Sequence, residues 1–189
     1  METSKTEKVY HSTYTYNFAN IKKDNFKESK NHEMWFGDGA YFFVDGIQEN
    51  SINSARQYKI DDSKVREPAK VHLVRVIEAE ITYNTDELLD LTNDEGVKQF
   101  NIARQDILDK IQMSGQSPIK DFEDYHVFNN LREHWGVKLV KGNVYIKFGI
   151  QRMLVEGEKA FYSRIPNVTI FVISNPDQYV SKASLKMSY

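Results

Sequence analysis

The sequence contains no cysteine among its 189 residues. Disulfide bonds, thiolate nucleophiles and thiolate metal sites are therefore excluded, and nothing argues for an oxidising compartment. No apolar run in the sequence approaches the length of a membrane span. The opening METSKTEKVYHSTY also lacks the apolar segment of a signal peptide. These absences predict a soluble, cytoplasmic protein with no membrane partner.

An excess of one charge sign is also absent. The chain has 25 Lys and Arg residues against 27 Asp and Glu residues, which gives a formal net charge of -2. Nonspecific attraction to nucleic acid is therefore not expected, and a nucleic-acid partner would need a local basic patch. Aromatic residues are plentiful instead, with 11 Tyr and 11 Phe, which suits a β-rich core or a stacking site.

Several motifs of known site chemistry are missing as well. The chain has neither GxGxxG nor a P-loop GxxxxGKS or GxxxxGKT, so no Rossmann or P-loop nucleotide site is supported. It also lacks the GxSxG of an acyl-transfer hydrolase. His32, His126 and His134 have no partners at metal-ligand spacing, so we expect no metal cofactor.

Hydrophobic periodicity predicts strands toward both ends of the chain and helices in the middle. The strands are expected at 8–15, 40–44, 70–83, 143–150, 152–157 and 167–174. A short helix should follow the second strand, and a polar connection should cover 59–70. Two further helices are expected within about 92–136, the first opened by Thr92 and Glu95 as a capping box. We therefore expect one α+β domain over 1–189, with two small, mostly antiparallel sheets and a helical insertion at about 92–136.

Three stretches near the N-terminus carry a family resemblance. Residues 9–13 read VYHST, 37–43 read GDGAYFF and 53–58 read NSARQY. In this order they resemble the histidine-tyrosine branch of the ADP-ribosyltransferase superfamily, which includes the poly(ADP-ribose) polymerases and diphtheria-toxin-like enzymes. Toward the C-terminus, VEG at 155–157, SRIPN at 163–167 and NP at 175–176 resemble uncharacterised bacterial members of the same fold.

The resemblance implies a cleft for NAD, which would be a substrate, between the two sheets. His11 would hydrogen-bond a ribose of NAD, the backbone of Ser12 would hold the carboxamide, and Thr13 would support the orientation of His11. Tyr41 and Tyr58 would sandwich the nicotinamide ring, because a tyrosine offers a flat apolar face at a low cost in conformational entropy.

This sequence departs from the family where its final strand commonly opens with a glutamate. That carboxylate stabilises the positive charge that develops on the ribose as nicotinamide leaves, yet Ile170 stands at the matching position. Glu156 is our first choice as its catalytic replacement, beside His11 and Tyr41, and Glu158 is the second. Arg164, in the loop that selects the acceptor in this superfamily, would bind the acceptor substrate.

We therefore expect an NAD-dependent mono-ADP-ribosyltransferase that uses no metal and relies on positioning and electrostatic support. Its acceptor would be a nucleic acid or a protein. The resemblance is compatible with a toxin or phage-defence effector, which would have an antitoxin or inhibitor as partner. Two alternatives stay open: a catalytically degenerate module that binds NAD or another nucleotide, and, ranked last, an enzyme that moves an RNA 2'-phosphate onto NAD.

Overall fold

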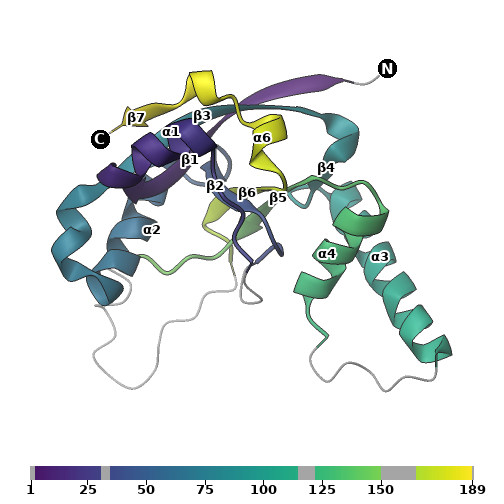
Figure 1. Cartoon of the computed structure of the whole chain (residues 1–189). Coiled ribbons are helices and arrows are strands. Elements are labelled where there is room, and N and C mark those ends of the chain that lie inside the picture. Colours follow the sequence, from purple (N-terminus) through teal and green to yellow (C-terminus); the bar gives the residue numbers. More distant parts are fainter. Residues whose placement is uncertain (1–2, 31–34, 115–121, 150–164, 189) are drawn as a thin grey trace, which may run out of the picture.

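Seven strands form one mixed sheet in the computed structural model, which describes residues 3–30, 35–114, 122–149 and 165–188 (Figure 1). The strand order is β4-β5-β6-β2-β1-β3-β7, and the pairing of β4 with β5 is parallel while the other pairings are antiparallel. The strands are β1 (Ser4–Tyr14), β2 (Ala40–Val44), β3 (Val74–Asn84), β4 (Leu88–Asp90), β5 (Leu139–Val144), β6 (Val168–Ile173) and β7 (Lys186–Ser188). With its helices, the sheet confirms the α+β class.

The prediction of two separate sheets is wrong, because β1 and β2 pair with each other. Val9 pairs with Val44 and Tyr10 pairs with Phe43, which joins the strands on either side into one sheet. This junction is short, whereas β1 pairs with β3 along its whole length. The two halves of the sheet therefore separate directly beyond Tyr10 and Phe43.

Helices cover parts of both faces of the sheet. The described α-helices are α1 (Phe18–Asp24), α2 (Ser51–Arg66), α3 (Asp94–Met113), α4 (Asp124–His134) and α6 (Pro176–Tyr179). Short 3-10 helices occupy Thr15–Asn17, Pro68–Leu73, Thr85–Glu87 and Lys182–Ser184. Figure 1 shows α3 and α4 side by side at the opposite end of the molecule from α2. None of the helices in the described ranges combines the length and apolar character needed to cross a membrane.

Three predicted boundaries in this part of the chain are corrected. Helix α2 continues to Arg66, so 59–66 is not the polar connection that its composition predicted. The N-cap of α3 is Asn93, which accepts from the Gly96 amide, whereas Thr92 hydrogen-bonds Asp90. Strand β5 begins at Leu139, four residues before the predicted start. The strand predicted at 152–157 lies outside the described residues.

Alternate residues of β1 and β2 feed two hydrophobic cores on the two faces of the sheet. Tyr10 and Phe43 pack into the core that α3 and α4 cover, with Phe100 and Phe128 among its members. Val9 and the neighbours of Phe43 belong to the second core, which includes residues of β3, β6 and α6. This division follows from the two-residue period of a strand, and it makes the β1–β2 junction the centre of the domain.

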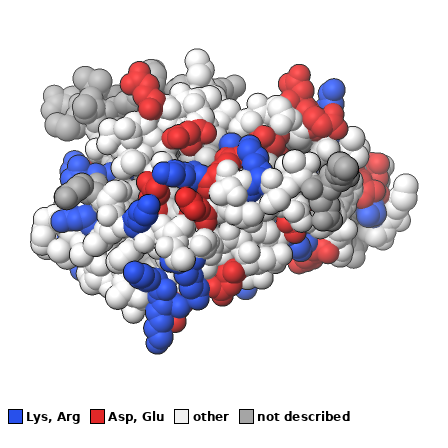
Figure 2. All heavy atoms as spheres, turned by 90° about the horizontal axis from the view of Figure 1, so that it is seen from above, with Lys and Arg blue, Asp and Glu red and all other residues white. Residues whose placement is uncertain are grey.

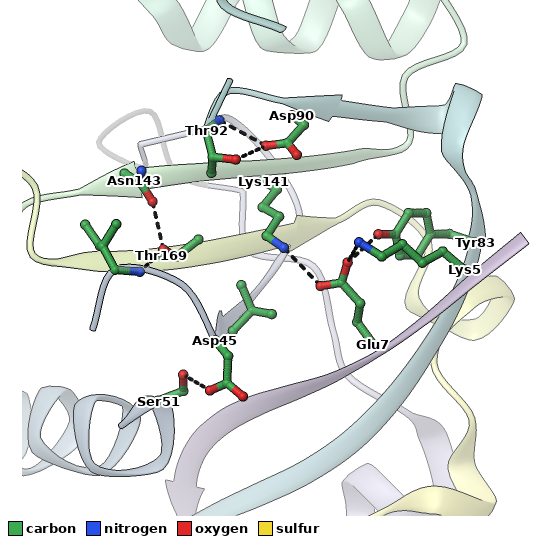
Figure 3. A network of polar contacts seen from close by, with 12 residues as sticks. Lys5, Glu7, Asp45, Ser51, Tyr83, Asp90, Thr92, Lys141, Asn143 and Thr169 are labelled. Carbon is green, nitrogen blue, oxygen red and sulfur yellow. Dashed lines mark hydrogen bonds and ion pairs between the residues drawn. The ribbon is translucent and has the colours of Figure 1, made fainter. Parts of the chain in front are cut away.

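A charged network also ties the two halves of the sheet together. Glu7 on β1 accepts hydrogen bonds from Tyr83 on β3 at 2.7 Å and from Lys141 on β5 at 3.1 Å (Figure 3). Burial alone would raise the pKa of Glu7, but these bonds and one from Lys5 outweigh it and lower the pKa. Elsewhere, acidic and basic side chains are interspersed over the face that Figure 2 shows, in keeping with the small net charge.

Candidate functional site

His11 and Tyr41 meet where β1 and β2 separate. His11 directly follows Tyr10, the last paired residue of β1, and Tyr41 lies two residues before Phe43, the partner of Tyr10 on β2. The Nδ1 atom of His11 is 2.9 Å from the Tyr41 carbonyl oxygen. A carbonyl oxygen only accepts, so Nδ1 carries the proton and donates it to this bond. In the neutral ring Nε2 is then an acceptor, and it has no hydrogen-bond partner among the described residues.

The surroundings of His11 favour the neutral imidazole. Burial has the largest effect on the pKa of His11 and lowers it, the nearby charge of Lys59 lowers it further, and the hydrogen bond to Tyr41 only partly opposes them. The ring packs edge-on against Phe26 and Phe42, with centroid distances of 5.1 and 5.7 Å. A half-buried, oriented and neutral imidazole is suited to accepting a hydrogen bond from a ligand hydroxyl.

A cavity of about 190 Å³, which we call the aromatic slot, opens beside His11. Trp35 lies 6.4 Å from Tyr41 and 6.4 Å from Tyr58 between ring centroids, so three aromatic rings group around it. The residues lining the slot are His11, Ser12, Lys27, Ser29, Trp35, Gly39, Ala40, Tyr41, Phe42, Phe43, Tyr58 and Ile170. Its aromatic walls fit a flat heterocycle.

The hydroxyl of Tyr41 is engaged in holding the turn that precedes β2. It donates to the Gly37 carbonyl at 2.6 Å and accepts from the Phe36 amide at 3.1 Å. Burial raises the pKa of Tyr41 to about 12, so the phenol stays protonated at neutral pH. Because the hydroxyl is occupied, Tyr41 offers a ligand its ring and not its oxygen.

Tyr58 comes to the slot from α2. Ala55, one helical turn earlier, is fully buried, while Tyr58 keeps 38% of its surface exposed and packs against Phe43 at 5.9 Å between ring centroids. Burial of the phenol raises the pKa of Tyr58. A half-exposed aromatic ring at the mouth of an apolar slot is able to stack on a ligand without first leaving a packed core.

A second cavity of about 490 Å³, which we call the polar cavity, adjoins the slot. His11 and Lys27 line both of them. The other residues of the polar cavity are Asn17, Asn20, Ile21, Asp24, Asn25 and Phe26. Amides and a carboxylate are partners for hydroxyl groups, and the Lys27 ammonium is a partner for phosphate. The two cavities together therefore suit a ligand with a flat ring at one end and a polar, anionic remainder.

Not every predicted site residue lies at these cavities. Ser12 lines the slot, but Thr13 is buried, accepts a hydrogen bond from Asn17 Nδ2 at 3.0 Å and lines neither cavity. Glu156 and Arg164 lie outside the described residues, and so does Glu158. Within the described ranges, no three His, Asp or Glu side chains are grouped as metal ligands.

Two residues of the site were missed from the sequence. Lys27 lies in a run of mixed charges and looks like a solvated residue, and Trp35 comes before the GDGAYFF stretch that drew attention. Neither residue carries a local sequence signal of its own, and only the structure shows that the half-exposed Trp35 and Lys27 line the slot.

Comparison of the chain with family models, curated proteins and solved structures gives no match. The functional argument therefore depends on the geometry of the site and on the residues themselves.

Proposed function

We propose that this protein binds NAD across the two cavities and transfers one ADP-ribose unit to a macromolecular acceptor. The observation that carries the proposal is the convergence of His11, Tyr41 and Tyr58, from β1, β2 and α2, on one cavity. These are the residues to which the resemblance gives NAD contacts. These side chains meet because β1 pairs with β2, and the motifs by themselves do not specify which strands pair.

The aromatic slot takes the nicotinamide ring in this proposal. A cavity of about 150 Å³ holds benzene, and the slot has about 190 Å³, which leaves room for a six-membered ring and its carboxamide. Tyr41, Tyr58 and Trp35 supply the aromatic faces. The backbone of Ser12 holds the carboxamide, and His11 Nε2 accepts a hydrogen bond from the adjoining ribose.

The polar cavity takes the ADP part of NAD. Lys27 lies on the boundary between the two cavities, where a dinucleotide has its diphosphate, and its positive charge complements the phosphates. Asn17, Asn20 and Asp24 are available to the hydroxyl groups of the adenosine ribose.

Transfer breaks the bond between C1' of the ribose and the nicotinamide nitrogen. Neutral nicotinamide leaves with the electron pair of that bond, and a nucleophile of the acceptor bonds to C1' and loses its proton. His11 and the aromatic rings position the substrate. Glu156 supplies the negative charge that supports the ribose as positive charge develops on it.

Ile170 favours a second candidate, a module that binds NAD without turning it over. Its fully buried side chain lines the slot, at the position where the family commonly has a glutamate. An isoleucine offers no negative charge to the ribose as nicotinamide leaves. The two candidates differ in whether Glu156 reaches the bound substrate.

Binding is tested by tryptophan fluorescence. The chain has two tryptophans, so the Trp135→Phe variant leaves Trp35 in the slot as the only reporter. Titration with nicotinamide and with NAD should change its emission in a saturable way, and adenosine should leave it unchanged. Absence of any change with both nicotinamide and NAD contradicts the proposed site.

Turnover is tested by nicotinamide release from NAD without added acceptor. We expect slow release by the wild-type protein and none by Glu156→Gln. Glu158→Gln tests our second choice: it should keep release, and loss of release in Glu158→Gln alone would move the role of the carboxylate to Glu158. Saturable NAD binding without release in any variant, also with candidate acceptors present, favours the binding module. Arg164→Ala should reduce transfer to an acceptor while sparing NAD hydrolysis, and equal loss of both contradicts an acceptor role for Arg164.

A further inference from the structure

Helix α4 holds the turn that precedes β2 and Tyr41. Three side chains spaced along one face of α4 contact this turn, residues 36–39, from about ninety positions away in the sequence. Arg132 Nη2 donates to the Phe36 carbonyl at 2.7 Å, Asn129 Oδ1 accepts from the Asp38 amide at 3.3 Å, and the Tyr125 hydroxyl donates to Asp38 Oδ1 at 3.2 Å.

The contact is close because the turn has a glycine where the helix approaches. Gly37 has a φ of +73°, and a Cβ atom there would lie 2.6 Å from Arg132 Nη1 and 2.8 Å from Asn129 Oδ1. The Arg132 guanidinium therefore lies against the peptide backbone itself. A side chain at position 37 would displace Arg132 and Asn129 from the turn, and the positive φ would strain any residue with a Cβ atom.

The same peptides are the ones that fix Tyr41. The Phe36 residue gives its carbonyl to Arg132 and its amide to the Tyr41 hydroxyl, and that hydroxyl donates to the Gly37 carbonyl. A short chain of hydrogen bonds thus runs from α4 through the turn to a wall of the aromatic slot. Helix α4 is in turn held on α3 by the Phe100–Phe128 contact at 4.6 Å and the Arg104–Asp124 ion pair.

Packing alone does not explain an arginine at position 132. Its guanidinium is buried enough that burial lowers the pKa of Arg132, and its Nε has no hydrogen-bond partner among the described residues. A buried charge with an unpaired donor is unfavourable to folding, so a purely structural contact would be better made by an apolar side chain. An apolar side chain at position 132 could not make the hydrogen bond to the Phe36 carbonyl.

We propose that Arg132 is a positioning residue of the aromatic slot, which fixes the Tyr41 ring through the turn at 36–39. The effect on ligand binding depends on the proposed function, since it assumes that nicotinamide enters the slot. The effect on the turn does not. The two therefore need separate measurements, both made on the full chain.

The first measurement needs no ligand and follows amide hydrogen exchange by NMR. Arg132→Met should speed exchange of the Phe36 and Asp38 amides at least about tenfold while leaving β1 and β3 protected, because only the turn loses its anchor. Arg132→Lys keeps a hydrogen-bond donor, so its amide exchange rates should lie between those of the wild type and of Arg132→Met. This variant replaces Arg132→Met in the experiment if the methionine variant does not fold. Arg104→Met, which removes the ion pair between α3 and α4, should leave both amides protected. Unchanged exchange at Phe36 in both Arg132 variants overturns the proposal.

The second measurement is the nicotinamide affinity of the same variants in the Trp135→Phe background. Arg132→Met should weaken binding about fivefold, and the loss should shrink when Tyr41→Phe has already cut the hydrogen-bond chain, as expected for coupled residues. Additive losses, or an unchanged affinity, overturn a role in positioning Tyr41. If the parent protein binds no nicotinamide, the proposed function fails, and faster exchange in Arg132→Met still supports control of the turn by Arg132.

Discussion

The aromatic slot and the polar cavity lie side by side yet are built in different ways. The slot has about 190 Å³, and strands β1 and β2, helix α2 and the exposed Trp35 supply its rings. The polar cavity has about 490 Å³, and the described residues that line it come from one stretch, Asn17 to Lys27, and from His11. Long-range pairing is thus needed for the cavity to which we assign the nicotinamide ring, whereas a local segment and His11 form the cavity to which we assign the hydroxyls and the phosphates.

His11 belongs to both cavities, so its loss should have the largest effect. His11→Ala removes the imidazole that we propose as a hydrogen-bond partner of the ligand, and NAD affinity should fall at least about 30-fold, or about 2 kcal/mol. Isothermal titration calorimetry measures this. The melting temperature should change little, and a collapse of the fold would instead assign His11 to the core.

Tyr58 belongs to the slot alone, so its loss should affect nicotinamide and NAD equally. Tyr58→Ala removes one stacking face, and both affinities should fall about tenfold, which corresponds to about 1.4 kcal/mol. Tyr58→Phe keeps the ring and should bind as the wild type does. A loss for NAD without a loss for nicotinamide would show that Tyr58 does not contact the nicotinamide ring.

Loss of Lys27 should weaken binding of the diphosphate part of the ligand and leave binding of nicotinamide unchanged. Lys27→Ala removes the charge at the boundary of the cavities, so NAD and ADP-ribose should bind about fivefold more weakly while nicotinamide is unaffected. Added salt should reduce the difference between the variant and the wild type. Lys30→Ala, an exposed lysine that lines neither cavity, is the matched control and should bind normally.

The smallest effect should be on the pH dependence of stability. The folded protein lowers the pKa of His11, so the unfolded chain binds this proton more readily, and stability is lost as pH falls below the ordinary histidine pKa of about 6.5. Between pH 7 and pH 5 the melting temperature of the wild type should fall about 2 °C more than that of His11→Gln. Parallel curves for the two proteins would mean that His11 titrates normally. Differential scanning calorimetry provides the comparison.

Local sequence patterns predicted the elements of the fold better than their assembly. The apolar run at 40–44 coincides with β2, and the helical spacing after Thr92 marks α3. The same reasoning divided the sheet in two, because nothing local reports that Val9 pairs with Val44. It also ended α2 too early, because the buried side chains of the helix after Tyr58, Asp61 and Ser63, are polar and leave no hydrophobic pattern.

The site shows the same division. The sequence by itself determined which residue types are present: a histidine on the first strand, a tyrosine behind a double-glycine turn and a second tyrosine one helix later, since motifs and periodicity depend on near neighbours. Only the tertiary structure decided that these side chains share a cavity with Trp35 and Lys27, and that Arg132 from α4 holds the turn before Tyr41. Contacts between segments so far apart follow from the burial and pairing of the whole domain, which no local pattern encodes.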